Sequence, residues 1–129
     1  MTANHSESGA DLEEYALLAE AMELSRWSRS FPDTDVSRYE ELAQRVEALA
    51  GAMADQFRSE ERNPESLREA ERALVSDFER FVVDVRRGPA SFRGWAEVCD
   101  RLDSLTATFR RHEELESELL RPKASGSGP

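Results

Sequence analysis

Five polar side chains occupy positions that the spacing of apolar residues assigns to the interior of a helical protein. Gln56 and Glu60 extend the apolar series of one segment, His112 and Glu116 extend that of another, and Asp77 interrupts a third. Buried carboxylates are costly unless they are paired, protonated or bound to a cation. Glu, Asp and His side chains that converge inside a helical bundle are the usual ligands of its metal sites. These five residues are therefore the candidate metal ligands.

Two other interpretations of the same residues stay open. The interior side of a helix is often solvated near its end, and Glu60 and Glu116 lie within two turns of predicted helix ends. The side chains can also form a buried polar network without a metal ion. Arginines close in sequence can pair with stray carboxylates, and the sequence favours this salt-bridged or solvated interpretation over the metal site. These arginines are Arg58, Arg62, Arg110 and Arg111.

Three groups of helix-breaking residues divide the chain into the segments that must position these side chains. The breakers are Pro32, Pro64 and the pair Gly88-Pro89. The segments between them are rich in Glu, Arg, Ala and Leu, and hardly any stretch alternates with the period of two that a strand requires. The sequence therefore predicts four helices, at residues 11–30, 35–62, 65–87 and 91–121.

Residues that favour helix starts precede three of these segments. Asp33 or Asp35 can cap the second helix, Asn63 before Pro64 suits the third, and Ser91 suits the fourth. Short connections make successive helices antiparallel neighbours, which predicts an all-α, antiparallel up-down-up-down four-helix bundle. The ends of the second and fourth helices then meet at one end of the bundle, so their polar residues can converge, with Asp77 somewhat deeper.

Apolar residues recur at alternating steps of three and four along each segment, as an interior helix face requires. One domain over residues 11–122 follows, with a disordered lead at 1–10 and a flexible Gly/Ser tail at 123–129. The predicted core positions are Leu17, Ala21, Leu24, Tyr39, Leu42, Val46, Leu49, Met53, Leu67, Ala70, Leu74, Phe78, Phe81, Val85, Trp95, Val98, Leu102, Leu105 and Phe109.

Composition excludes several classes of protein. Among 129 residues, 27 acidic and 17 basic side chains give a net charge of −10, which repels nucleic acid. The single cysteine, Cys99, excludes an internal disulfide and a multi-thiolate zinc site. It has no second histidine near it, so it is predicted to be a semi-buried spacer and not a nucleophile. No apolar run approaches the ~20 residues of a membrane span, and a soluble cytoplasmic protein is expected.

The chain resembles the hemerythrin-like (HHE cation-binding) domains over residues 12–121. FRRHEELESELLRP, residues 109–122, resembles the last-helix motif of that family, with His112 at its histidine. MADQFRSEER, residues 53–62, is similar to the HF-x-x-EE motif, with Gln56 in the place of the histidine. Two weaker similarities lie in LLAEAMEL, where Ala21 stands at the histidine position, and in PESLREAERALVSDFERF, where the family has a histidine near Asp77.

The resemblance implies a non-heme di-iron centre held by histidines and bridging carboxylates. Glu60 matches the carboxylate that follows the missing histidine, His112 matches the last-helix histidine, and Glu116 lies near the second acidic ligand of that helix. The imidazoles expected at Ala21, Gln56 and Ala73 or Asp77 are missing.

The first functional prediction is therefore a hemerythrin-like bundle that has lost most di-iron ligands. It acts as a non-catalytic binding or regulatory module and holds no cofactor. The alternative is a reduced carboxylate and histidine site at the five candidate ligands. Such a site binds non-heme iron or another divalent cation for sensing, storage or oxygen binding.

The other polar and aromatic residues have simpler interpretations. His5 is predicted to be inert in the disordered lead, and adjacent glutamates such as Glu113-Glu114 are predicted to be solvated. Four aromatic residues gather toward the connections at the far end of the bundle and are predicted to cap the core. The alternative is an exposed patch for a protein partner or a homodimer. These aromatics are Trp27, Phe31, Phe92 and Trp95.

Overall fold

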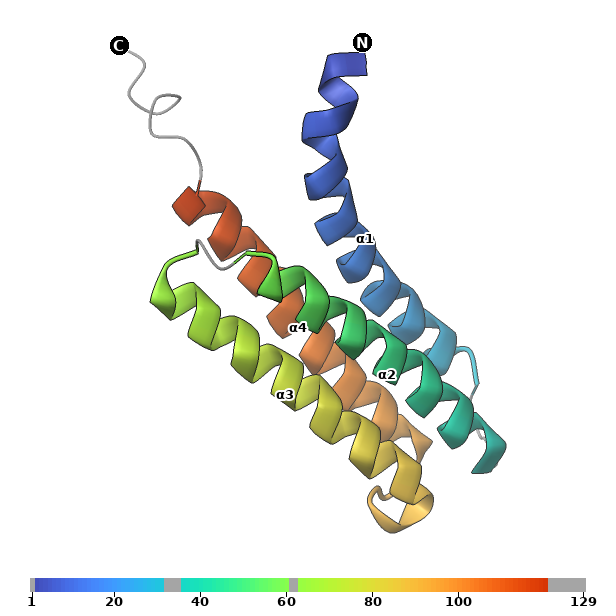
Figure 1. The fold of residues 1–129 in the computed structure, drawn as a ribbon. Coiled ribbons are helices and arrows are strands. Elements are labelled where there is room, and N and C mark those ends of the chain that lie inside the picture. The colour runs from blue at the N-terminus through green and yellow to red at the C-terminus, as the bar shows by residue number, and fades with distance from the viewer. Residues whose placement is uncertain (1, 32–35, 61–62, 121–129) are drawn as a thin grey trace.

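The computed structural model describes the backbone of residues 2–31, 36–60 and 63–120, and the side chains of residues 16–31, 37–60 and 63–119. These residues form an all-α four-helix bundle without strands, as the sequence predicts (Figure 1). None of the described helices is both long enough and apolar enough to cross a membrane. The helices are α1 (Thr2–Arg29), α2 (Val36–Arg58), α3 (Glu65–Arg87) and α4 (Trp95–Leu120), with a short 3₁₀ helix η1 (Gly88–Ala90) between α3 and α4.

Each helix packs against its neighbours in sequence, and α1 also packs against α4. Successive helices run in opposite directions (Figure 1). Arg29 at the end of α1 accordingly pairs with Asp100 and Asp103 near the start of α4, at 2.6 and 2.5 Å. In the same way, Glu40 near the start of α2 lies 3.6 Å from Arg86 near the end of α3. This arrangement brings the end of α2, the start of α3 and the end of α4 to one end of the bundle.

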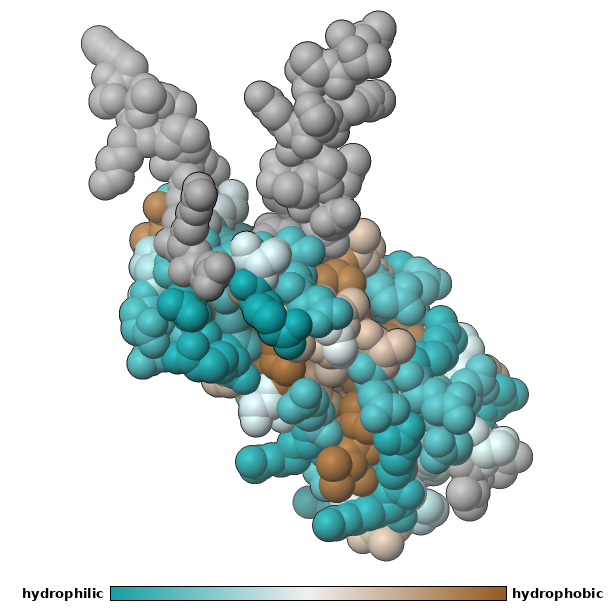
Figure 2. Space-filling view, in the orientation of Figure 1, coloured by the Kyte–Doolittle hydropathy of each residue, from teal (hydrophilic) through white to brown (hydrophobic). Residues whose placement is uncertain are grey.

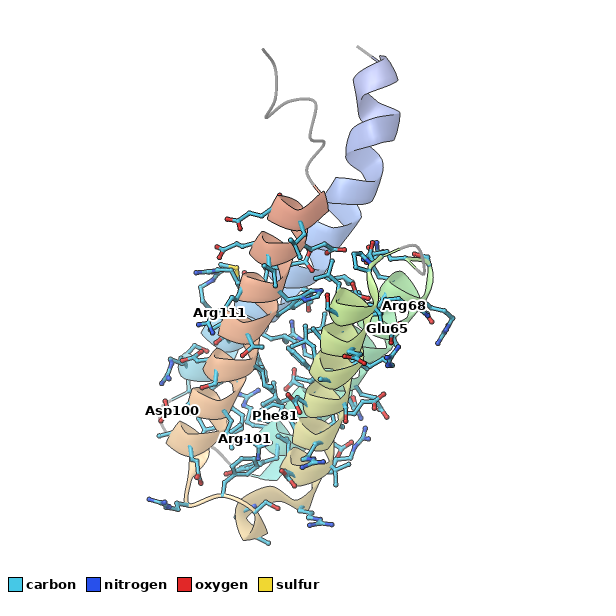
Figure 3. All side chains as sticks on the ribbon, turned by 90° about the vertical axis from the view of Figure 1, so that its left-hand side faces the viewer. Glu65, Arg68, Phe81, Asp100, Arg101 and Arg111 are labelled. Carbon is cyan, nitrogen blue, oxygen red and sulfur yellow. The ribbon has the colours of Figure 1, made fainter. Side chains whose placement is uncertain are left out.

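The core follows the predicted apolar positions closely. Phe78, Phe81 and Phe109 are fully buried, and Phe81 lies between α3 and α4 (Figure 3). Phe109 makes edge-to-face contacts with Phe78 and Phe57, at ring-centroid distances of 6.2 and 6.4 Å. Aromatic pairs of this geometry are favourable beyond their buried area. Of the predicted core positions, Leu17 and Leu105 are only half-buried and Ala70 is exposed.

Helix boundaries differ from the prediction at three points. α1 begins at Thr2 and so includes residues that the sequence predicts as a disordered lead. α2 ends at Arg58, and not at residue 62. α4 begins at Trp95, because the backbone of Gly88, at φ 66°, ends α3 and leads into η1. A positive φ is a conformation that glycine adopts without steric cost.

The predicted cap of the fourth helix is wrong. The backbone N–H of Ser91 donates to the carbonyl of Gly88 at 2.9 Å, four residues before α4 begins. Glu97 instead accepts a hydrogen bond from the backbone N–H of Arg93 at 2.8 Å. A carboxylate in the first turn also interacts favourably with the helix dipole. Asp33, Asp35 and the Gly/Ser tail lie outside the described residues, as do the side chains of residues 1–15, which include His5.

The aromatic residues at the far end of the bundle are covered, in agreement with their predicted role as core caps. Trp95 and Phe92 are buried. Trp27 and Phe31 are half-buried, and the guanidinium groups of Arg45 and Arg38 lie 5.0 and 4.0 Å from their ring centroids. Trp95 also donates its Nε1–H to the carbonyl of Ser28 at 2.7 Å, which joins α4 to α1.

We expect Trp95→Phe to lower the free energy of unfolding by about 1–2 kcal/mol more than Trp27→Phe does. Both changes remove a similar amount of ring, but only the first removes the 2.7 Å hydrogen bond to the Ser28 carbonyl, which keeps only the longer 3.4 Å bond from the Phe31 N–H. Urea denaturation followed by circular dichroism measures the two losses. Equal losses would show that the bond to Ser28 contributes nothing.

Candidate metal centre

Three buried ionisable side chains meet at the end of the bundle where α3 begins and α4 ends. Glu71 of α3 is 2% exposed, and His112 and Glu116 of α4 are 7% and 5% exposed. Each offers one ligand atom that lies within 4.8 Å of the other two. Nε2 of His112 is 3.4 Å from Oε2 of Glu71. This Glu71–His112–Glu116 cluster can therefore present two carboxylate oxygens and one imidazole nitrogen to a single point.

The α2–α3 connection adds an amide and a third carboxylate to the cluster. Nδ2 of Asn63 donates to Glu116 at 2.8 Å and to Glu71 at 3.1 Å, and it lies 3.4 Å from Glu60. Gln56 donates to the other oxygen of Glu60 at 3.2 Å. An amide nitrogen carries only two hydrogens, so Asn63 cannot satisfy three carboxylates at once.

Two buried atoms of the cluster have no hydrogen-bond partner among the described residues. They are Nε2 of His112 and Oε1 of Glu116. Buried polar atoms are almost always hydrogen-bonded in folded proteins, so an unpartnered atom calls for an explanation. Both are atom types that bind metal ions, because an imidazole nitrogen and a carboxylate oxygen are both common ligands.

The arginines that could neutralise these carboxylates lie elsewhere. Arg58 pairs with Asp55 at 2.9 Å, and Arg110 contacts the sulfur of Met22 at 3.5 Å. Arg111 is exposed on the outer side of α4 (Figure 3), and the predicted partner Arg62 lies outside the described residues. Within the described part of the chain, no Arg or Lys forms an ion pair with Glu71 or Glu116.

Burial changes the protonation of the cluster. It raises the pKa of Glu71 to about 7, with further increases from the charges of Glu60 and Glu116 and an opposing effect of the Asn63 hydrogen bond. It raises the pKa of Glu116 to about 7 as well, and the charge of Glu60 adds to this. Burial lowers the pKa of His112, so that its imidazole stays neutral. At neutral pH, Glu71 and Glu116 are therefore partly protonated, so the cluster carries less negative charge than two ionised carboxylates would.

The structure brings together only part of the predicted ligand set. His112 and Glu116 lie in the cluster, and the half-buried Glu60 and Gln56 lie at its edge. Asp77 is exposed, so its prediction as an inward ligand is wrong. The next residue, Phe78, is fully buried, and adjacent residues of a helix point about 100° apart.

Sequence reasoning missed Glu71, although a signal for it exists. Glu71 follows Leu67 by four residues and precedes Leu74 by three, which is the same spacing that defines the core face. Ala70 also fits that spacing and is apolar, so the sequence predicts it in the core, but Ala70 is exposed and Glu71 is buried. Glu113, predicted to be solvated, is also buried, at 7% exposed.

Asn63, which the sequence predicts as the cap of the third helix, does not cap α3 in the structure. The N-cap position of α3 is occupied by Pro64, and no side chain there bonds to the helix start. The carbonyl of Pro64 accepts the first helical bond, from the N–H of Arg68 at 3.0 Å. The amide of Asn63 is consequently available to the carboxylates of the cluster.

The positions that carried the hemerythrin-like resemblance do not supply further imidazoles. Ala21 is fully buried, Gln56 donates to Glu60, and Ala73 is exposed. The ligands that the structure does bring together are Glu71, His112 and Glu116. Comparison of the chain with protein-family models, curated proteins and solved structures found no match.

Proposed function

We propose that the chain is a binding module for one divalent metal ion, held by Glu71, His112 and Glu116. The observation that carries this proposal is the pair of buried, unpartnered atoms, Nε2 of His112 and Oε1 of Glu116, within a cluster that has more carboxylates than donors. Of the two functions predicted from sequence, we favour the metal-binding one, because Glu71 is a buried ligand in addition to the predicted His112 and Glu116. It includes no catalytic step.

The donor set selects among metals. Mg²⁺ and Ca²⁺ prefer oxygen ligands alone, and Cu⁺ prefers sulfur. Two carboxylates and one imidazole suit first-row divalent ions such as Mn²⁺, Fe²⁺ and Zn²⁺. Zn²⁺ is the best first probe of the three, because sites of this kind bind it more tightly than Mn²⁺ or Fe²⁺. Three protein ligands also leave room for water in the coordination shell.

At neutral pH a cation competes with protons for the two carboxyl groups of the cluster. Metal binding requires ionised carboxylates and a neutral imidazole. Burial already keeps His112 neutral by lowering its pKa, so only the protons of Glu71 and Glu116 must leave. A divalent ion then compensates both charges and gives Oε1 of Glu116 and Nε2 of His112 the partners that they lack.

A titration of the metal-free chain tests the proposal. After removal of metals with EDTA, isothermal titration calorimetry is expected to show one Zn²⁺ per chain. Glu71→Gln and Glu116→Gln preserve side-chain size but remove the charge, and each is expected to weaken binding by more than about tenfold. The matched control is Glu114→Gln, which changes an exposed residue of α4, the helix that carries Glu116. This variant should bind Zn²⁺ as the unmodified chain does.

Two results would count against this function. One is an unmodified chain that takes up neither Zn²⁺, Mn²⁺ nor Fe²⁺. The other is a Glu114→Gln chain that loses as much affinity as Glu116→Gln, which would indicate diffuse attraction to an acidic surface. The hemerythrin-like family, a cytoplasmic location and a protein partner remain predictions from sequence.

A further inference from the structure

A cavity of about 330 Å³ lies between α2 and α3, next to the metal cluster, and Glu71 belongs both to the cavity lining and to the cluster. Its apolar wall consists of Ala54 and Phe57 from α2 and Val75 from α3. Figure 2 views the molecule from the side of α2 and α3 and shows apolar surface between flanks of hydrophilic side chains. A cavity of this volume is at the small end of the range that holds small molecules.

Three arginines line the same cavity, although the chain has a net charge of −10. Arg58 comes from the end of α2, and Arg68 and Arg72 lie one helical turn apart on α3. Figure 3 shows Arg68 beside Glu65 at the start of α3. Glu79, two turns beyond Arg72, also lines the cavity. The cavity therefore combines three guanidinium groups with an apolar wall and with the carboxyl groups of Glu71 and Glu79.

The present partners of these arginines are replaceable. Arg68 and Arg72 share the single carboxylate of Glu65, at 3.8 and 3.0 Å. Arg58 pairs with its helical neighbour Asp55. The side chains of all three pairs are at least 40% exposed, and exposed ion pairs contribute little to stability. Each guanidinium also has five N–H donors, far more than one carboxylate takes up.

We propose that this cavity binds a small organic carboxylate with an apolar body. Its carboxylate lies among the guanidinium groups of Arg58, Arg68 and Arg72, which match that group in geometry and charge. Its apolar body lies against Phe57 and Val75. The distance along α3 from Arg68 to Val75 is about 10 Å, which suits a chain of about eight carbons. This site shares the Glu71 side chain with the proposed metal site, but its binding groups are the arginines and the apolar wall, so it does not require a metal ion.

Octanoate is the probe, and the full chain is kept free of metal with EDTA during the test. Titration followed by ¹H–¹⁵N correlation spectra is expected to give saturable shifts of α2 and α3 amides around the cavity. 1-Octanol, which lacks the charge, and acetate, which lacks the apolar body, should each bind at least about tenfold more weakly.

Variants of α3 distinguish octanoate binding in the cavity from nonspecific attraction of octanoate to any exposed arginine. The double variant Arg68→Gln and Arg72→Gln is expected to weaken octanoate binding by about tenfold or more. Its matched control is Arg80→Gln with Arg87→Gln, two exposed arginines of the same helix that do not line the cavity. The control should bind octanoate as the unmodified chain does.

Any of three results would overturn the inference: no octanoate binding, equal binding of 1-octanol, or an equal loss in the control double variant. Because no metal is present in these titrations, none of the three bears on the cation site. A failure of Zn²⁺ binding would likewise leave the octanoate result unaffected.

Discussion

Zn²⁺ is expected to raise the free energy of unfolding of the chain by about 4 kcal/mol when the free ion is held near 1,000 times its dissociation constant. The stabilisation arises because Glu71 on α3 and His112 and Glu116 on α4 come together only in the folded bundle. An ion that binds the folded chain alone shifts the unfolding equilibrium by mass action. In a domain of this size, the melting temperature should rise by about 10 °C or more. Circular dichroism melts in buffered Zn²⁺ measure the change.

Matched variants identify the source of this stabilisation. Glu71→Gln and Glu116→Gln should lose most of the Zn²⁺ effect, whereas Glu114→Gln should keep it. The variants are compared as differences with and without Zn²⁺, so any change in the stability of the metal-free chain cancels. If all three variants respond to Zn²⁺ alike, the ion acts at another place on the acidic surface, and the assigned ligands are wrong.

The bundle could be predicted from sequence because its core repeats a simple pattern. Steps of three and four place residues such as Leu42, Val46 and Phe78 on one face of their helices, and all three are fully buried. Helix ends were harder, because they depend on single residues. The start of α4 is set by the positive φ of Gly88 and by the reach of Glu97 back to Arg93, and neither is visible in a periodic pattern.

The metal cluster was only partly predictable, and the reason is physical. His112 and Glu116 extend the apolar stripe of α4 by steps of three and four, and both are buried. On α3, however, Ala70 and Glu71 both satisfy the spacing, and only the rotation of the helix about its axis decides between them. That rotation is fixed by the burial of Leu67 and Phe78 against other helices, so it is a tertiary property. It turns Glu71 into the bundle and Asp77 out of it.

Asn63 illustrates a second limit of sequence reasoning. An asparagine before a proline at a helix start is a good capping signal, but its side chain can bond to only a few acceptors at once. In the structure, the carboxylates of Glu71 and Glu116 take its donors. These acceptors come from α3 and α4, so no local pattern around Asn63 could reveal them.

The metal-free chain is expected to lose stability as the pH rises from 5 to 8, and the carboxyls of Glu71 and Glu116 account for the loss. Their pKa values are about 7 in the folded chain against an ordinary value of 4.5. The folded state therefore holds protons that the unfolded state has released, and this stability is lost as the pH rises through 7. His112 has the opposite effect on stability, because its pKa is lowered in the folded chain. Its contribution to stability increases as the pH rises, but only below about pH 6.5, the ordinary pKa of histidine.

A comparison of variants isolates the two carboxyls from His112 and from the rest of the chain. Relative to the double variant Glu71→Gln and Glu116→Gln, the unmodified chain should lose about 5 kcal/mol of unfolding free energy between pH 5 and pH 8. Urea denaturation at each pH measures the difference, in which the contribution of His112 largely cancels. The control is the double variant of Glu114 and Glu118 to Gln, both exposed on α4, which should run parallel to the unmodified chain.

The same titration also tests the premise of the metal site. Zn²⁺ must displace the protons of Glu71 and Glu116, so its affinity should rise over the pH range in which the metal-free chain weakens. The Zn²⁺-bound chain should then keep at pH 8 the stability that the metal-free chain loses. If the unmodified chain and the Glu71/Glu116 double variant instead run parallel from pH 5 to 8, both carboxyls ionise as solvated groups. In that case the cluster needs no cation, and its two unpartnered atoms are hydrated.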